Sequence, residues 1–281
     1  MSDLVSTQWL TAHLDDVRVV DASWYMPGDR RDAHAEFESG RIPEAVFFDI
    51  DAISDKSTDL PHMLPSPGQF KTAMEALEIG DSDTVVVYDK AGMFSAARAW
   101  WMLKAMGHDA VKVLDGGFPK WEREGRWVAF GVGETGPYRP RHPVFTPNPN
   151  PALIRDFNAV MGVVKDKTAQ MVDARSAARF TASEPEPRAG VRGGHMPGAR
   201  NVHFRALLTP EGTFRKPAEL RAIFERAGVD LKRPIVTTCG TGVTAAMVML
   251  ALREIGVDDV ALYDGSWTEW GARPEAPVVA G

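Results

Sequence analysis

The chain has 281 residues, of which 44% are hydrophobic and 25% charged. That balance is typical of a globular protein with a buried core, and the length suits two domains. The 32 Lys and Arg residues against 38 Asp and Glu residues give a formal net charge of -6, which argues against nucleic-acid binding. No apolar run approaches the ~20 residues of a membrane-spanning helix, and the N-terminus lacks a secretory signal pattern. We therefore expect no membrane partner and a cytoplasmic location.

The first half of the chain alternates short apolar strands with helices. Residues 17–21, 85–88 and 111–114 are β-branched runs that we expect to be strands. Pro67 follows Ser66 at the expected start of a helix, and Gly80 stands just past its end. Because the strands are apolar on both faces, the pattern predicts a parallel sheet covered by helices.

The second half repeats this pattern after a stretch rich in glycine and proline. Residues 131–150 have little apolar periodicity and read as an extended linker. Strands are expected at 170–173, 235–238 and 260–263, and a helix is expected between Pro217 and Gly228. The sequence thus predicts an α/β protein with one domain at 1–130 and another at 151–281.

The two halves are also similar to each other residue by residue. Asp21 corresponds to Asp173, and Asp115 to Asp264, in segments that align in the same order. Asp89 stands where the second half has Cys239, the only cysteine of the chain. A duplicated domain explains this self-similarity, and a single cysteine excludes an internal disulfide and a zinc site built from several thiolates.

The turn after the strand at 235–238 carries Cys239 in the sequence CGTGVT and leads into an apolar helix. Gly240 and Gly242 can adopt backbone conformations closed to other residues, so we expect the turn to curl with its N–H groups facing inward. The helix that follows adds the positive end of its dipole. These donors would favour the ionised form of the thiol at Cys239.

Other loops of this kind fit the sequence less well. A phosphate-binding loop needs Gly-Lys-Ser/Thr, which is absent, and a cysteine phosphatase has an arginine where this chain has Ala245. A papain-like enzyme pairs its cysteine with a histidine on a different scaffold. The plainest alternative is a buried cysteine without chemistry. An anion-binding turn around one thiol, with no cation of its own, favours sulfur chemistry.

Together with the tandem copies, GHMPGA at 194–199, the DGG-x-x-x-W and DGSW elements and the CGTGVT loop resemble the rhodanese superfamily of two-domain sulfurtransferases. The resemblance covers essentially the whole chain. It implies two tandem rhodanese-like domains, each a parallel sheet flanked by helices. The first would be inactive at its loop, because the carboxylate of Asp89 cannot carry sulfane sulfur. Thiosulfate-using members have basic residues after the cysteine, whereas the CG-x-GVT loop is similar to that of the 3-mercaptopyruvate branch.

The resemblance also implies a set of site residues. Cys239 would carry a persulfide, cradled by the loop residues Gly240, Thr241, Gly242, Val243 and Thr244. Two arginines would hold the carboxylate of the substrate, Arg179 in DARSAARF and Arg188 in EPEPRAG. A proton relay beside the cysteine would use Thr241, His62 and Asp51.

The activity implied is transfer of sulfur from 3-mercaptopyruvate to a thiol, such as a thioredoxin-like protein, or to cyanide, with release of pyruvate. The resemblance implies no metal and no organic cofactor. Two alternatives stay open at this point. One is a thiosulfate:cyanide sulfurtransferase, and the other is a non-catalytic persulfide carrier or protein-binding module.

Overall fold

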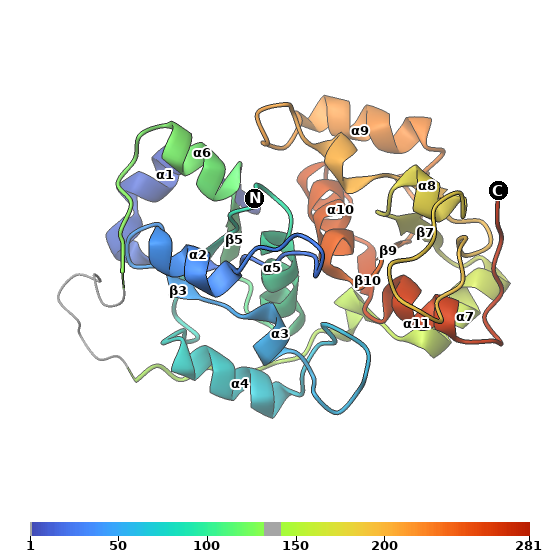
Figure 1. Cartoon of the computed structure of the whole chain (residues 1–281), viewed down its shortest axis with the longest axis horizontal. Coiled ribbons are helices and arrows are strands. Elements are labelled where there is room, and N and C mark those ends of the chain that lie inside the picture. Colours follow the sequence, from blue (N-terminus) through green and yellow to red (C-terminus); the bar gives the residue numbers. More distant parts are fainter. Residues whose placement is uncertain (1, 132–141) are drawn as a thin grey trace. The chain divides into compact units, whose positions relative to one another are not determined.

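The computed structural model describes residues 2–131 and 142–281, so residues 132–141 of the expected linker lie outside the described residues. It divides into two compact units (Figure 1). Unit 1 comprises the described parts of Met1–Asp55, Pro65–Asn150 and Pro210–Thr213, and unit 2 comprises Lys56–Leu64, Pro151–Thr209 and Phe214–Gly281. Each unit therefore includes one short segment from the other half of the sequence. Within the described ranges, no helix is both long and apolar enough to cross a bilayer.

Unit 1 is built on a parallel sheet with the strand order β1-β5-β4-β2-β3. Its strands are β1 (Leu4–Val5), β2 (Val17–Asp21), β3 (Val46–Phe47), β4 (Thr84–Tyr88) and β5 (Val111–Leu114). Its helices are α1 (Thr7–Ala12), η1 (Leu14–Asp16), α2 (Ala33–Ser39), α3 (Ile50–Ile53), α4 (Pro67–Ala76), α5 (Ala96–Ala105) and α6 (Gly117–Arg123). Helix α5 packs against β4 and β5 and is buried along its whole length.

Unit 2 repeats this topology, with the strand order β6-β10-β9-β7-β8. Its strands are β6 (Ile154–Arg155), β7 (Gln170–Asp173), β8 (Arg200–Asn201), β9 (Ile235–Thr238) and β10 (Val260–Tyr263). Its helices are η2 (Pro151–Leu153), α7 (Phe157–Asp166), α8 (Ala177–Phe180), η3 (Phe204–Leu207), α9 (Pro217–Arg226), α10 (Val243–Glu254) and α11 (Ser266–Ala272). The predicted pair of parallel sheets flanked by helices is confirmed.

The helix signals in the sequence act largely as expected. Ser66 caps α4 through a capping box with Gln69, and proline occupies the first turn of both α4 and α9. Gly228 follows α9 with φ 76°, the left-handed conformation that ends many helices. The expectation for Gly80 was wrong. Helix α4 ends earlier, and Glu78 takes the left-handed position with φ 54°.

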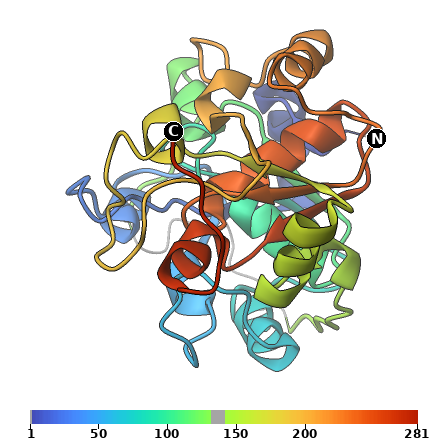
Figure 2. The same ribbon diagram turned by 90° about the vertical axis from the view of Figure 1, so that its right-hand side faces the viewer.

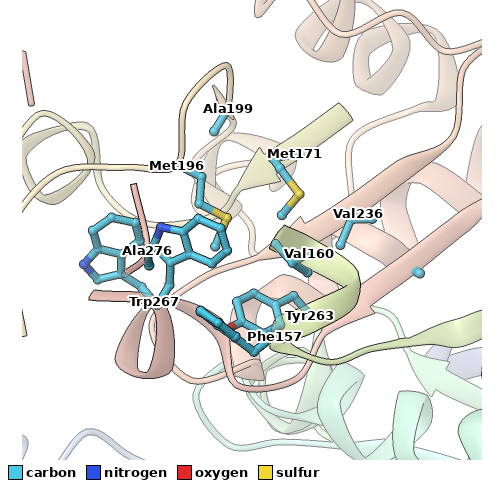
Figure 3. Packing of buried hydrophobic residues seen from close by; sticks show 11 residues of the cluster. Phe157, Val160, Met171, Met196, Ala199, Val236, Tyr263, Trp267 and Ala276 are labelled. Carbon is cyan, nitrogen blue, oxygen red and sulfur yellow. The ribbon is translucent and has the colours of Figure 1, made fainter. Parts of the chain in front are cut away.

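The core of unit 2 lies between one face of its sheet and helices α7 and α11 (Figure 3). Phe157 and Val160 of α7 pack with Trp267 and Trp270 of α11 and with Tyr263 at the end of β10. Both tryptophans are fully buried and pack in this cluster. Helix α11 begins at Ser266, next to the cysteine loop. The packing of α11 in this core therefore fixes the position of the residues that contact the loop.

The C-terminal segment packs on unit 2 beside α8. Val279 pairs with His195 in an isolated antiparallel bridge, and the Gly281 N–H donates to the Thr181 carbonyl at 3.2 Å. Figure 2 shows the last residues running from α11 up to the side of α8. His195 itself is buried, stacks on Phe180 with ring centres 3.8 Å apart and contacts the Phe180 carbonyl. These contacts give His195 a structural role.

The two units differ at the carboxylate that ends their second strand. In unit 2, Asp173 is paired with the buried Arg175 guanidinium at 2.6 Å. In unit 1 the equivalent Asp21 has Ser23 at the position of that arginine, and its carboxylate accepts from the Ser23 N–H and hydroxyl. Burial raises the pKa of Asp21 from 3.8 to about 6, although the Ser23 hydrogen bonds act in the opposite direction. Among residues 2–131 and 142–281, the buried acid Asp21 therefore has no ion-pair partner of the kind Asp173 has.

This difference predicts opposite effects of the same substitution in the two units. The raised pKa of Asp21 gives a stability contribution that is complete below the unfolded pKa of 3.8 and lost as the pH rises through about 6. The loss amounts to about 3 kcal/mol, so Asp21→Asn should stabilise unit 1 near pH 7 and flatten its dependence on pH. Asp173→Asn is the matched control, because stranding Arg175 should cost about 3–5 kcal/mol. Urea unfolding of both variants between pH 4 and pH 8 tests this, and equal effects in both units would contradict it.

Candidate active site

The candidate site lies where two neighbouring strands of unit 2 end. Strands β7 and β9 are adjacent, with Asp173 level with Thr238, and the Ala174 N–H donates to the Thr238 carbonyl at 2.8 Å. After β7 the chain continues to β8 on one side, and after β9 it continues to β10 on the other. Ligands of open parallel sheets bind at such a switch point. Cys239 is the first residue after β9, so the fold places the thiol there.

Helix α11 holds the backbone of the cysteine loop from one side. The Cys239 N–H donates to the Ser266 hydroxyl at 3.3 Å, and the Cys239 carbonyl accepts from the Trp267 N–H at 2.9 Å. The Gly240 carbonyl accepts both the N–H and the hydroxyl of Thr268, at 2.9 and 2.8 Å. These bonds satisfy the carbonyl groups of Cys239 and Gly240 and use the N–H of Cys239.

Ser266 occupies a backbone conformation that favours glycine. Its φ is 49°, and the corresponding residue in unit 1 is Gly117 with φ 55°. A side chain in this region costs roughly 1–2 kcal/mol. The buried Ser266 hydroxyl offsets that cost by donating to the Tyr263 carbonyl at 2.8 Å while accepting from Cys239. Ser266 therefore ties the cysteine to the end of β10.

Helix α10 begins at Val243, directly after the loop, and Gly242 caps it with φ 81°. The expected left-handed conformation is thus present at Gly242. It is absent at Gly240, where a β-carbon would instead lie 3.1 Å from Nη2 of Arg179. A side chain at this position would require the Arg179 guanidinium to shift by a few tenths of an ångström. Within residues 2–131 and 142–281, no acceptor takes the N–H groups of Gly240 to Thr244. They are the donors from which an anion-binding loop is made.

The equivalent loop of unit 1 shows what such donors can hold. The buried carboxylate of Asp89 accepts the Ala91 N–H at 3.0 Å through Oδ1. Its Oδ2 accepts the N–H groups of Phe94, Ser95 and Ala96 at 2.7–2.9 Å. The first loop is therefore filled by its own anionic side chain, and its helix starts later than α10 does. The duplicated sequence offers an internal precedent for an anion at the cysteine loop.

Of the two predicted clamp arginines, Arg179 has a guanidinium that comes close to the cysteine loop. Arg179, in α8, reaches Gly240 and is also paired with Glu186, with Nη2 2.5 Å from Oε2 and Nε 3.2 Å from Oε1. Arg188 is half-buried in the loop that follows α8, two residues beyond Glu186. The position of Arg179 suits recognition of a carboxylate near the thiol, and the role of Arg188 stays a prediction.

Arg175 completes a charged cluster behind Arg179. Its guanidinium contacts Asp173 at 2.6 Å and Glu186 at 2.8 Å, with all three side chains almost fully buried. Burial lowers the pKa of Arg175, but the charges and hydrogen bonds of the two carboxylates outweigh this and raise it. Arg175 stays charged and fixes the position of the Glu186 carboxylate.

The predicted relay residues fall in different units. His62 is buried and lies in Lys56–Leu64, a segment that belongs to unit 2. Two residues later, the Leu64 N–H donates to Asp264 at 2.8 Å. Asp264 directly follows β10 and precedes Ser266 by two residues, so this segment is anchored beside the element that holds the cysteine. Asp51 lies in unit 1, where its carboxylate is exposed and accepts from the Trp24 indole N–H at 3.0 Å.

The thiol is well covered by protein. Cys239 is 2% exposed and Thr241 7% exposed, whereas Gly240 and Thr244 are partly exposed. In the part of the chain that the structure describes, no group of three His, Cys, Asp or Glu side chains could hold a metal ion.

Sequence reasoning missed Ser266, Arg175 and Glu186. The signal for Ser266 was present, because it replaces a glycine of the first copy. Arg175 is the last residue of DAR, two positions after Asp173 at the end of the strand. Glu186 lies in the sequence between Arg179 and Arg188. Their ion pairs depend on the path of the loop after α8, which local sequence does not specify.

Comparison with known proteins identifies the family. The model of the rhodanese-like domain matches residues 6–124 and 159–273. The chain belongs to the rhodanese family. The 3-mercaptopyruvate sulfurtransferase of Escherichia coli is 44% identical over 98% of this chain and 96% of its own length. The human 3-mercaptopyruvate sulfurtransferase is 41% identical over 99% of this chain and 95% of its own. A rat thiosulfate sulfurtransferase is also 41% identical, over 99% and 95%.

Solved structures of this rhodanese family show the same fold. The Tum1 protein of Saccharomyces cerevisiae matches with a TM-score of 0.90 and 34% identity, covering 99% of this chain and 98% of its own. The SseA protein of E. coli, described as a 3-mercaptopyruvate sulfotransferase, matches with a TM-score of 0.85 and 41% identity, covering 95% and 99%. The predicted membership of the rhodanese superfamily is confirmed.

Proposed function

We propose that this protein is a sulfurtransferase that takes sulfur from 3-mercaptopyruvate, carries it as a persulfide on Cys239 and passes it to a thiol or to cyanide. The observation that supports this most is the loop of Gly240 to Thr244, whose N–H groups have no acceptor among the described residues. In unit 1 the equivalent loop holds a carboxylate. A second support is the absence of any basic residue within the CGTGVT loop.

The chemistry runs in two steps. The Cys239 thiolate attacks the sulfur of the donor, the carbon–sulfur bond breaks, and its electron pair remains on carbon as the enolate of pyruvate. The enolate gains a proton, and Cys239 keeps the sulfur as a persulfide. The acceptor thiolate then attacks the outer sulfur and releases the cysteine as a thiolate. The loop N–H groups stabilise the anionic sulfur in each step, as donors do in an oxyanion hole.

Arg179 and Arg188 hold the carboxylate of the donor in this proposal. Mercaptopyruvate keeps its carboxylate several atoms from the sulfur, so its clamp must lie outside the cysteine loop. Arg179 meets this need, because it belongs to α8 yet reaches Gly240. Thiosulfate is a compact dianion and would gain more from cations within the loop itself. The arrangement therefore favours mercaptopyruvate as the donor.

We assign Thr241 and His62 to delivery of the proton to the enolate. Both are buried and both belong to unit 2, and the participation of Asp51 stays a prediction. Thr241→Val and His62→Asn should each lower kcat by about 100-fold with little change in KM, because general acid catalysis contributes at least that much. Thr241→Ser keeps the hydroxyl and should retain most of the activity. Steady-state release of pyruvate measures all three, and full activity of Thr241→Val would remove the hydroxyl from the mechanism.

A comparison of two donors tests the proposed function. Purified protein is given either 3-mercaptopyruvate or thiosulfate, with cyanide as the acceptor, and thiocyanate is measured in both reactions. We expect a clearly higher kcat/KM for mercaptopyruvate. A preference for thiosulfate would instead assign the thiosulfate:cyanide activity, and a single turnover with each donor would indicate a persulfide carrier. A thioredoxin-like acceptor and a cytoplasmic location stay predictions. The name of a 40% identical Arabidopsis thaliana relative, a thiosulfate/3-mercaptopyruvate sulfurtransferase, places that relative in mitochondria.

A further inference from the structure

Arg179 uses one edge of its guanidinium for Glu186 and turns another toward the cysteine loop. Nε and Nη2 form the pair with the Glu186 carboxylate, at 3.2 and 2.5 Å. A β-carbon on Gly240 would lie 3.1 Å from Nη2 and 3.8 Å from Nη1 of the same guanidinium. Because the guanidinium is planar, a carboxylate bound along one edge fixes the direction of the other. Glu186 thus determines how the Nη1–Nη2 edge faces the loop.

Glu186 also balances the charge beside the thiol. Its carboxylate is only 4% exposed and contacts both Arg175 and Arg179. Arg175 is in turn paired with Asp173. The two acids and two arginines sum to zero formal charge, so the cluster presents an oriented donor edge without a net positive charge. Buried charges of this kind act strongly on nearby ions, because water screens them poorly.

We infer that Glu186 is a positioning residue that sets donor specificity, by aligning Arg179 with the carboxylate of the donor and by keeping the cluster neutral. This inference rests on the proposed sulfurtransferase function. A donor with a single carboxylate needs the oriented edge more than it needs extra positive charge. Binding of a compact dianion such as thiosulfate depends more on net positive charge, which the neutral cluster does not provide.

The substitution Glu186→Gln separates these effects, because it keeps the size of the side chain and removes its charge. We expect KM for mercaptopyruvate to rise about tenfold with kcat retained, since the alignment of one charge-assisted pair is weakened. We expect kcat/KM for thiosulfate to rise about tenfold, since one positive charge is uncovered. The ratio of the two kcat/KM values should then move about 100-fold toward thiosulfate. A purely structural role of Glu186 would instead lower both values together.

Two further variants make the experiment decisive. Glu186→Asp keeps the charge and shortens the side chain, so it should raise KM for mercaptopyruvate and leave thiosulfate turnover unchanged. Glu184→Gln is the matched control, because Glu184 is an exposed acid of the same loop, and it should change neither donor. A parallel loss for both donors in Glu186→Asp would overturn the inference, even if Glu186→Gln fails to fold.

The failure of this inference differs from failure of the proposed function. If the unaltered protein turns over neither donor, the sulfurtransferase proposal is contradicted. If it turns over mercaptopyruvate and Glu186→Gln shows an unchanged donor ratio, only the role of Glu186 is contradicted.

Discussion

Cys239→Ser is expected to lower the turnover of mercaptopyruvate by about 10⁴-fold or more, because it removes the atom that stores the transferred sulfur. Serine keeps the size of the side chain and the backbone bonds to Ser266 and Trp267, so the loop should keep its structure. Steady-state release of pyruvate measures the loss. Far-ultraviolet circular dichroism and thermal unfolding should be nearly unchanged.

Mass spectrometry of the intact protein provides the direct measurement of the intermediate. Since Cys239 is the only cysteine in the sequence, any sulfur gained as a persulfide must be on this residue. The protein treated with donor should gain one sulfur atom and lose it again on addition of cyanide, and the serine variant should gain none. Turnover of mercaptopyruvate without a sulfur adduct, or a serine variant that remains active, would contradict the persulfide mechanism.

Arg179→Ala and Arg188→Ala should each raise KM for mercaptopyruvate by about 100-fold. That change corresponds to the loss of about 3 kcal/mol, a common value for a charge-assisted contact to a carboxylate in a site shielded from water. The cluster behind Arg179 should survive its removal, because Glu186 keeps its contact with Arg175 at 2.8 Å. We therefore expect a binding defect with an intact fold.

The control for these variants is Arg226→Ala, since Arg226 is an exposed arginine at the end of α9 and away from the strand ends. It should leave KM unchanged. Lysine at position 179 should restore only part of the affinity, because an ammonium group cannot bind a carboxylate through two parallel hydrogen bonds. An unchanged KM in both alanine variants would show that neither arginine holds the donor.

Much of the fold follows from periodicity and from duplication. The strand at Val17–Asp21 and its counterpart at Gln170–Asp173 have the predicted bounds, because a short run with valine that ends at an aspartate recurs in both copies. Gly80 does not end α4, because Glu78 takes the left-handed position before it. The exchange of residues 56–64 and 210–213 between units could not be predicted, because it depends on packing between distant segments.

The site was predicted in its parts and not in its connections. The cysteine and the glycine cap at Gly242 follow from the loop sequence, whereas the two arginines come from the resemblance to the rhodanese family and their role stays a prediction. The sequence does not show how near Arg179 comes to Gly240, a glycine whose φ lies outside the left-handed region. Glu186 also escaped notice, because a buried acid shared by two arginines resembles an ordinary surface acid when only its neighbours in the chain are known.

The exchanged segment 56–64 has a consequence for how this gene can be divided. Expression of the downstream half alone would omit a stretch that packs with it and that carries a buried histidine, although the cysteine and both arginines would be present. Chimaeras joined at the midpoint between two homologues would likewise combine that stretch with a foreign surface. The boundary between the two sequence copies therefore differs from the boundary between the two folded units. We expect recombination between homologues to be tolerated best where the crossover keeps residues 56–64 with the C-terminal half.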